Sequence, residues 1–171
     1  ETILHAMNRH YHLEEYKKLI SNLREEIPDL AVTTDLIVGF PGETEELFQE
    51  TLQTLDELRF SGIHVFPYSR RKGTPAAAYP DQVSETGKKE RVHRVQKEES
   101  GWNREFRSGF IGRIVHVLAE EEKDGLFEGL AESYIRVSIK GDGLHRGEIY
   151  PVKIEALTAG GLIGTAVRED Y

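Results

Sequence analysis

The stretch TTDLIVGFPGET, residues 33–44, decides how the first part of the chain is interpreted. Its apolar end is nearly continuous, which is typical of a parallel strand buried on both faces. It then enters a turn with two glycines and a proline, and the leucines and the phenylalanine that follow are spaced for one helical face. The stretch therefore predicts a strand, a tight turn and an amphipathic helix.

The turn itself has two interpretations. Ligands of parallel sheets bind at the carboxyl ends of strands, and Gly39 and Gly42 would let the backbone approach a ligand closely. Glu43, Glu45 and Glu46 at the helix start would repel a phosphate, but they suit hydroxyls or an amine. Alternatively, the glycines only shape a strand-to-helix junction, and the acids complement the helix dipole. This stretch alone leaves both interpretations open.

A second strand-and-loop unit follows one helix later. GIHVFPYS, residues 62–69, predicts a strand, and the loop after it carries three cations and two hydroxyls: Ser69, Arg70, Arg71, Lys72 and Thr74. Such a loop suits a carboxylate or a nucleic-acid phosphate, although a solvated basic loop has the same composition. Because two polar loops at neighbouring strand ends meet at one sheet edge, we expect a shared site there.

The remaining pattern of residues 1–107 is helix, strand, helix, strand, helix. Residues 1–30 are expected to form one helix, and a long charged helix is expected from Ser84 to about Phe110. Such alternation predicts βα units on a parallel sheet, with too few strands for a closed barrel. His64 lies inside the second strand, where we expect a buried histidine without a functional role.

The pattern changes after Gly109. About five short strands follow, separated by the turn segments KDG, KGDG and TAGG. Their regular spacing predicts a small β-barrel, and the boundary is placed between Arg107 and Gly112.

Composition limits the possible functions. The net charge is −8, with 15 Lys and Arg against 19 Asp and Glu in residues 1–108, and 7 against 11 in residues 109–171. Each part is thus −4, so any contact with nucleic acid needs a local basic patch. No apolar run approaches the roughly 20 residues that cross a bilayer, and no secretion signal is visible, which favours a cytoplasmic protein without membrane contact. Cysteine is absent, and no metal-ligand spacing or nucleophile–base motif is found.

Three motifs resemble one known family when they are taken in order. AMNRHY, TDLIVGFPGET and HVFPYSRRKGTPAA, followed by the small β domain, resemble the methylthiotransferase family of radical S-adenosylmethionine (SAM) enzymes. The resemblance covers practically the whole chain. It implies an α/β fold: the C-terminal part of a partial TIM barrel built from βα units in residues 1–108, then a small all-β TRAM barrel in residues 109–171.

The resemblance implies a SAM-binding edge. The turn after residue 38 would be the family's version of the motif Gly-x-Ile-x-Gly-x-x-Glu, although one extra residue precedes the Glu and Asp35 stands where the first Gly would fall. The loop SRRKGT follows the pattern Ser-x-Arg-x-Gly-Thr. The implied cofactor-binding residues are Arg9, Val38, Gly39, Gly42, Glu43, Ser69, Arg71 and Thr74.

The iron–sulfur part of the family pattern is missing. The family holds two 4Fe–4S clusters, one of them through C-x-x-x-C-x-x-C, and this chain has no cysteine and so no metal ligands of that kind. The resemblance therefore implies a C-terminal fragment without catalytic residues of its own, inactive alone, whose partner is the missing N-terminal portion of the same enzyme.

The resemblance also suggests a substrate. The sequence of the loop resembles that of the enzymes that add a methylthio group to C2 of N6-threonylcarbamoyladenosine at position 37 of tRNA. Ribosomal-protein enzymes tend to have acids where Arg70 and Arg71 stand. The TRAM-like part would bind the anticodon loop of tRNA through Arg113, Arg136, Lys140, Arg146 and Lys153. Three alternatives remain: a ribosomal-protein methylthiotransferase fragment, a stand-alone TRAM-type RNA-binding adaptor, and a scaffold that completes a barrel with a separate subunit.

Overall fold

A computed structural model describes residues 1–167 of the chain. Its contacts divide it into two compact units, one from Glu1 to Asn103 and one that begins at Arg104. The domain limits 1–108 and 109–171 stay a prediction from the sequence. Within the described residues, no helix combines the length and the apolar character that crossing a membrane requires.

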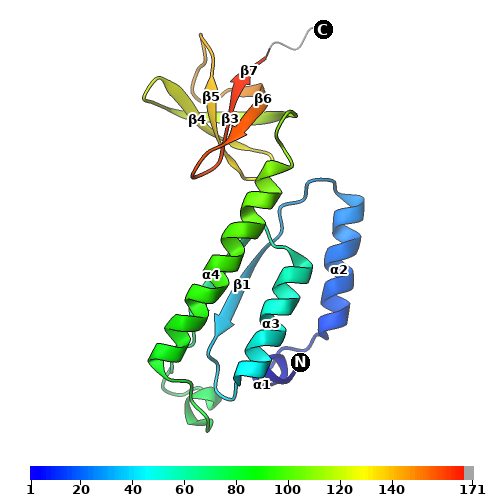
Figure 1. Ribbon diagram of the computed structural model, residues 1–171, viewed down its shortest axis with the longest axis vertical. Helices are drawn as coiled ribbons and strands as arrows, with labels where there is room; N and C mark the ends of the chain where they lie inside the picture. The colour runs from blue at the N-terminus through cyan, green and yellow to red at the C-terminus, as the bar shows by residue number, and fades with distance from the viewer. Residues whose placement is uncertain (168–171) are drawn as a thin grey trace. The chain divides into compact units, whose positions relative to one another are not determined.

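The first unit contains the predicted alternation of strands and helices (Figure 1). Its elements are α1 (Thr2–Ala6), α2 (Leu13–Glu26), β1 (Thr33–Val38), α3 (Glu45–Leu58), β2 (Gly62–Pro67), the 3₁₀ helix η1 (Pro75–Ala78) and α4 (Glu85–Ser108), which continues into the second unit.

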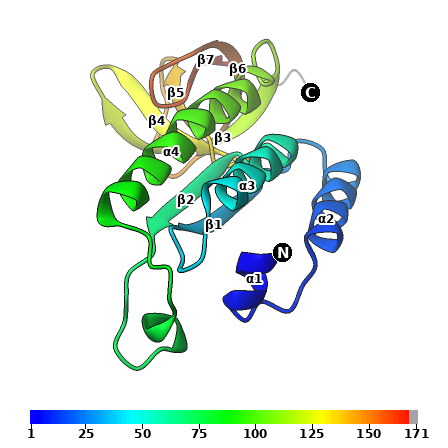
Figure 2. The same ribbon diagram turned by 60° about the horizontal axis from the view of Figure 1, so that its bottom comes forward.

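β1 and β2 pair in parallel, with Thr33 opposite Gly62 and Val38 opposite Pro67. In the view of Figure 2, α3 lies in front of the two strands, with α2 and α4 on either side of it. One buried core joins these helices to one sheet face, and it is formed by Ile20, Val38, Phe48, Leu55, Leu58, Phe60, Ile63, Val95 and Trp102. The α/β fold class predicted for this part is confirmed.

The other face of the sheet is exposed, which corrects two expectations. β1 was expected to be buried on both faces, but Asp35 and Ile37 are exposed while Leu36 and Val38 face the helices. His64, expected to be buried, is exposed on the same face opposite Asp35. Within residues 1–167, β1 pairs only with β2 and the core of this unit lies on the helical face, so the period-2 alternation of the strands decides burial.

The single helix expected over residues 1–30 is wrong, because α1 and α2 are separate. Asn8 has a positive φ of 59°, and the Arg9 amide donates to the carbonyl of Leu4, which ends the first helix. α2 then starts anew at His12, whose side chain and that of Glu15 form a reciprocal capping box.

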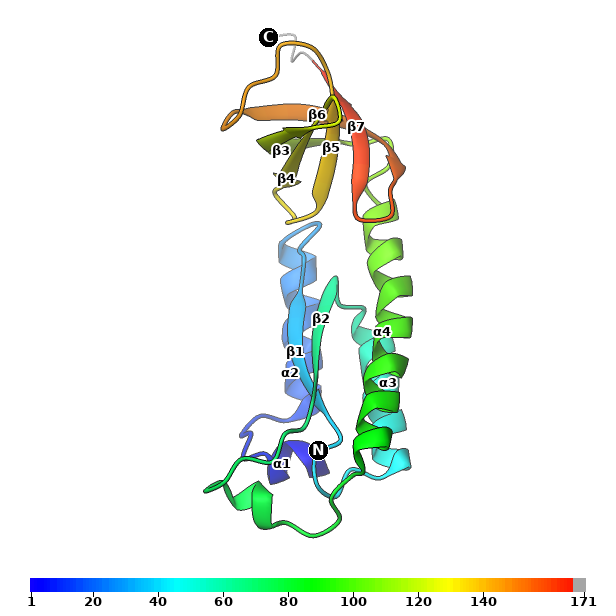
Figure 3. The same cartoon turned by 90° about the vertical axis from the view of Figure 1, so that its left-hand side faces the viewer.

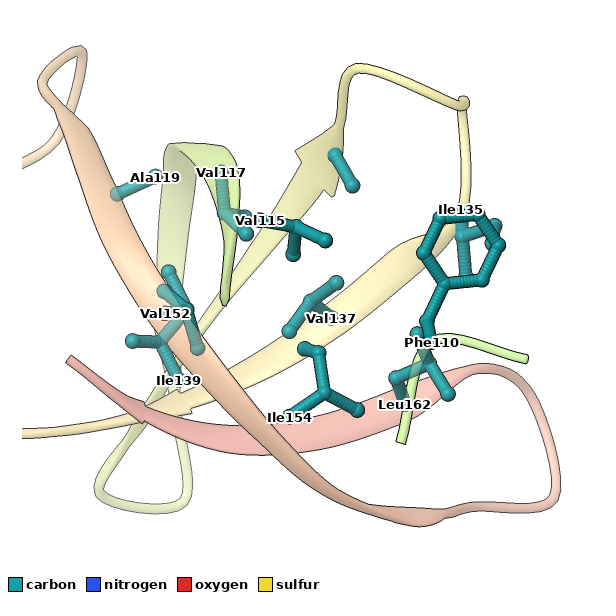
Figure 4. Close-up of a cluster of buried hydrophobic side chains, with 11 residues drawn as sticks. Phe110, Val115, Val117, Ala119, Ile135, Val137, Ile139, Val152, Ile154 and Leu162 are labelled. Atoms are coloured by element: carbon teal, nitrogen blue, oxygen red, sulfur yellow. The ribbon is translucent and has the colours of Figure 1, made fainter. Parts of the chain in front are cut away.

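The second unit is a closed barrel, as predicted. Its strands are β3 (Ile114–Lys123), β4 (Leu126–Ala131), β5 (Arg136–Lys140), β6 (Ile149–Leu157) and β7 (Leu162–Ala166). They close in the order β3-β4-β5-β7-β6, and only β5 and β7 pair in parallel. Alternate side chains point into the barrel, where Val117, Val137 and Ile139 are completely buried (Figure 4).

Candidate functional site

The turn after β1 is held by its own glycines. Gly39 has φ +72° and Gly42 has φ +83°, a region that other residues avoid. The Gly39 amide donates to Oε1 of Glu43 over 3.0 Å, and the Gly42 amide donates to the carbonyl of Asp81 over 3.0 Å. The turn is therefore fixed both within itself and to the segment that leads into α4.

Glu43 faces the interior rather than solvent. It is 6% exposed, and its Oε1 lies 2.7 Å from Nη1 of Arg91 on α4. Burial raises the pKa of Glu43 above its ordinary value, although the Gly39 N–H and the Arg91 guanidinium oppose that shift. Glu45 and Glu46, in contrast, lie exposed in the first turn of α3. The three acids, which the sequence analysis treated together, thus have different surroundings.

The loop after β2 lies beside this turn. The Tyr68 amide donates to the carbonyl of Val38 over 2.8 Å, and the rings of Phe40 and Tyr68 meet edge to face with centroids 5.1 Å apart. Figure 3 shows the segment between β2 and α4 at the same end of the sheet as the turn after β1. The two loops therefore lie side by side at one edge of the sheet, and the shared site expected there stays a prediction.

The basic part of that loop is exposed. Thr74 donates its hydroxyl to the carbonyl of Arg71 over 2.8 Å, which closes a turn around Gly73. Arg70, Arg71 and Lys72 form no salt bridge within residues 1–167. Three positive charges therefore follow the end of β2, and no carboxylate of residues 1–167 lies in salt-bridge contact with them.

A pocket of about 230 Å³ runs along β1 between α1, α2 and α3. Arg9 and Glu43 are the two predicted cofactor residues that line it, and most of the other lining residues are apolar. Val38, Gly39, Gly42, Ser69, Arg71 and Thr74 are not among its lining residues. The structure thus places seven of the eight predicted residues, all except Arg9, at the carboxyl ends of β1 and β2, and only Arg9 and Glu43 line this pocket.

Two groups of residues near the turn were not among the predicted site residues. Ile37 and Phe66 are register partners on the exposed sheet face, with 41% and 51% of their surface accessible. Lys88 and Arg91 lie buried on α4, which the sequence presented only as a charged helix. The alternation of residues along each strand could have identified the first group, but no local signal distinguishes Arg91 from the other cations of α4.

The residues at this edge fit part of SAM. The exposed Ile37 and Phe66 offer an apolar surface for an adenine ring, and the unpaired cations suit a carboxylate. The hydroxyl of Tyr68 is buried beside this edge and has no hydrogen-bond partner within residues 1–167. Iron–sulfur clusters do not fit this chain. It has no cysteine, and the described residues contain no cluster of His, Asp and Glu that could hold a metal.

On the barrel, the five cations predicted to bind RNA are only partly brought together. Lys140 and Lys153 both lie opposite Thr165 of β7, on one outward row. Arg136 starts β5 and pairs with Glu120 over 3.4 Å, while Arg113 lies over the Phe110 ring and Arg146 is in the loop before β6.

Neighbouring carboxylates partly neutralise the positive charge of these cations. Lys140 lies 2.7 Å from Glu155, and its hydrogen bond, together with that of Thr165, holds the pKa of Glu155 below its ordinary value. Lys153 forms no salt bridge within the described part of the chain, but its charge also helps to lower the pKa of Glu155. The outward face beside it is apolar, because Ile114, Leu118 and Ile149 are all exposed there.

Residues 1–55 match the model of the Radical SAM superfamily. The chain is 41% identical over 169 residues to a tRNA-2-methylthio-N(6)-dimethylallyladenosine synthase of Acetivibrio thermocellus, covering 97% of this chain and 35% of that protein. It is 42% identical over 158 residues to a threonylcarbamoyladenosine tRNA methylthiotransferase of Bacillus subtilis, covering 90% and 35%.

The name of a third relative gives a protein, not tRNA, as its substrate. The chain is 41% identical over 175 residues to a ribosomal protein uS12 methylthiotransferase of Heliobacterium modesticaldum, covering 99% of this chain and 38% of that protein. The chain therefore spans little more than a third of the length of these relatives. Over nearly its whole length it is similar to methylthiotransferases of tRNA and of a ribosomal protein, and its first third carries the radical SAM match.

Proposed function

We propose that this chain is the C-terminal part of a radical SAM methylthiotransferase, and that the complete enzyme adds a methylthio group to N6-threonylcarbamoyladenosine in tRNA. Support comes from the match of residues 1–55, from the relatives, and from the two strand-end loops at one edge of the sheet. When bound, SAM and the clusters supply the radical chemistry. The residues of this chain bind and orient SAM and the tRNA substrate.

The basic loop after β2 is the observation that carries the choice of substrate. Arg70, Arg71 and Lys72 are exposed, and none of them forms an ion pair within residues 1–167. They follow the strand whose end is bonded to the turn after β1 through Tyr68 and Val38. Cations that the protein leaves unpaired at a candidate site favour an anionic ligand.

The two tRNA modifications named among the relatives differ in this respect. A threonylcarbamoyl group carries a carboxylate and a hydroxyl, whereas a dimethylallyl group is a hydrocarbon. Arginine binds carboxylates through paired hydrogen bonds, and it gains nothing from a hydrocarbon of that size. The loop therefore favours the threonylcarbamoyl substrate.

Within this proposal, the other residues have defined tasks. Arg9, Val38, Gly39, Gly42, Glu43, Ser69, Arg71 and Thr74 form the SAM-binding edge. The barrel binds the anticodon loop of tRNA, with Lys153 and Arg136 as its main phosphate contacts. The clusters are held by an N-terminal portion of the same enzyme, without which this chain is inactive, and the tRNA substrate places the enzyme in the cytoplasm.

The decisive experiment compares two tRNA substrates in the complete enzyme, one with threonylcarbamoyladenosine and one with dimethylallyladenosine at position 37. We expect methylthio transfer to the first, and a loss of about tenfold to hundredfold in kcat/KM when Arg70 and Lys72, which lie outside the proposed SAM-binding edge, are both replaced by Ala. Transfer to the dimethylallyl substrate instead would refute the choice of substrate. A reading frame upstream of Glu1 without C-x-x-x-C-x-x-C would refute the enzyme itself.

One observation favours a second candidate, a ribosomal-protein substrate. Residues 109–171 carry 7 Lys and Arg against 11 Asp and Glu, a net charge of −4 that suits a basic protein better than RNA. Methylthio transfer to ribosomal protein uS12 in the same assay would support this candidate. A third candidate, the stand-alone RNA-binding adaptor, requires the 171-residue chain to bind tRNA tightly by itself.

A further inference from the structure

The first half of α4 reaches across to the turn after β1. Arg91 is 9% exposed, and its Nη1 donates to two oxygens of Glu43, to Oε1 over 2.7 Å and to the main-chain carbonyl over 3.0 Å. The same Oε1 accepts the Gly39 amide over 3.0 Å. A continuous series of buried polar contacts thus runs from α4 through Glu43 to the backbone of the turn.

A second residue of α4 closes the turn from the same side. Lys88 is buried, and its Cγ would lie 2.5 Å from a β-carbon placed on Gly39. Its Nζ pairs with Glu85 over 2.7 Å and lies 5.5 Å from the centre of the Tyr68 ring. One turn of α4 therefore contacts both strand-end loops.

Stability alone is a weak reason for this arrangement. A buried ion pair loses much of its Coulomb energy to desolvation, and apolar residues of similar volume are often as stable. What an apolar pair does not provide is a directed contact to a main-chain amide and a carbonyl of the same turn. The pair therefore serves the position of the backbone rather than the stability of the core.

We propose that Arg91 is a positioning residue of the strand-end site: through Glu43 it fixes the backbone at Gly39 in the conformation that ligand binding requires, while the side chain of Lys88 packs against Gly39. The inference rests on the proposed function for the identity of the ligand, SAM. Arg91 itself does not touch the ligand.

Arg94 provides a matched control. It lies one helical turn further along α4, pairs with Glu45 over 2.8 Å and has its guanidinium 4.7 Å from the centre of the Phe48 ring. Arg91 lies 5.2 Å from the same ring. Both arginines thus contact the start of α3, but only Arg91 is bonded to the turn.

The first measurement needs no cofactor. Amide hydrogen exchange at Gly39 is followed by NMR in the 171-residue chain and in its variants Arg91→Gln, Arg91→Lys and Arg94→Gln. We expect faster exchange at Gly39 in R91Q, an intermediate rate in R91K, and the original rate in R94Q. Fluorescence of Trp102, the single tryptophan, verifies that each variant is folded. Equal exchange at Gly39 in R91Q and R94Q would overturn the inference.

The second measurement links the turn to the ligand. In the complete enzyme we expect the KM for SAM to rise about tenfold to hundredfold in R91Q, with a partial return in R91K and little change in R94Q. If SAM binds the original enzyme but its KM is unchanged in R91Q, the positioning role is refuted while the proposed function stands. If the original enzyme does not bind SAM, the proposed function fails, whatever the exchange at Gly39 shows.

Discussion

The side chain of Lys88 occupies the space that a β-carbon on Gly39 would need. The Lys88 Cγ would stand 2.5 Å from that β-carbon, and Lys88 itself is buried on α4. Gly39 also has φ +72°, so two independent constraints exclude other residues there. Gly42, three residues later, has φ +83° but nothing within 4 Å of its missing β-carbon. A side chain at residue 39 would thus meet both a steric clash and backbone strain, whereas a side chain at residue 42 would meet backbone strain alone.

We expect Gly39→Ala to lower the free energy of unfolding of the first unit by about 2 to 5 kcal/mol, through backbone strain and the displacement of Lys88. Gly42→Ala should cost only about 1 to 2 kcal/mol, because strain alone acts there. Denaturant unfolding followed by Trp102 fluorescence measures both. Equal losses in the two variants would show that Lys88 does not restrict residue 39.

A similar pair of glycines tests the closure of the barrel. A β-carbon on Gly161 would lie 2.1 Å from the carbonyl oxygen of Arg136, which belongs to the backbone and cannot move aside alone. We expect Gly161→Ala to destabilise the barrel by more than about 3 kcal/mol, or to prevent its closure. Gly160→Ala, with nothing within 4 Å, should change stability by about 0.5 kcal/mol or less.

Calorimetry on the chain distinguishes these outcomes for Gly160 and Gly161. If both variants melt like the original chain, the close approach between the start of β7 and the start of β5 does not restrict the barrel.

Much of the fold could be predicted because it depends on local periodicity. The apolar end of residues 33–38, the helical spacing after it and the turn segments of residues 109–171 were enough for the βα units and the five-stranded barrel. Burial was not predictable in the same way. A strand as apolar as Asp35–Val38 suggests two covered faces, but cover depends on which other elements pack there, and the described residues supply helices on one face only.

The candidate site shows the same limit. Sequence spacing located the two strand-end loops, because parallel strands must end at one edge. It did not locate Arg91, which lies 48 residues from Glu43 and has several charged neighbours on α4. Packing between α3 and α4 decides which residue pairs with Glu43 over such a distance along the chain. The composition of α4 alone therefore predicted only a charged helix, without its contact to Glu43.

The ion pair between Lys140 and Glu155 predicts how the stability of the barrel changes as the pH is lowered. The hydrogen bond from Lys140, then that from Thr165, lowers the pKa of Glu155 in the folded chain. A lowered pKa in the folded state means that the stabilisation is present above the unfolded pKa, about 4.3, and is lost as pH falls through the folded value. The loss of melting temperature on acidification should therefore be smaller in Glu155→Gln than in the original chain.

The matched control for this measurement is Glu122→Gln, an exposed carboxylate near the end of β3. Calorimetric scans between pH 6 and pH 3 should show the original acid limb in this control and a flatter one in E155Q. The same limb in both variants would mean that the pair between Lys140 and Glu155 does not form in solution.

The last prediction concerns the proposed tRNA-binding face of the barrel. Lys140 and Lys153 lie opposite the same residue, Thr165, yet Lys140 is paired with Glu155 over 2.7 Å while Lys153 forms no ion pair within the described residues. Lys153 acts on Glu155 only at longer range, so it can bind a phosphate without first breaking a salt bridge, and it should contribute more to RNA binding than Lys140. Arg136, paired with Glu120 over a longer 3.4 Å, should lie between them.

We expect Lys153→Glu to weaken tRNA binding by the complete enzyme about tenfold and to reduce the slope of log K against log salt by about 0.7 to 1. Arg136→Glu should weaken binding less, and Lys140→Glu least, because Lys140 gives up its pairing with Glu155. Titrations of labelled tRNA at several salt concentrations give both the affinity and the slope. Unchanged, salt-independent binding in K153E would remove this face from the proposed interface. That result would favour the ribosomal-protein substrate, because an acidic barrel surface suits a basic protein better than RNA.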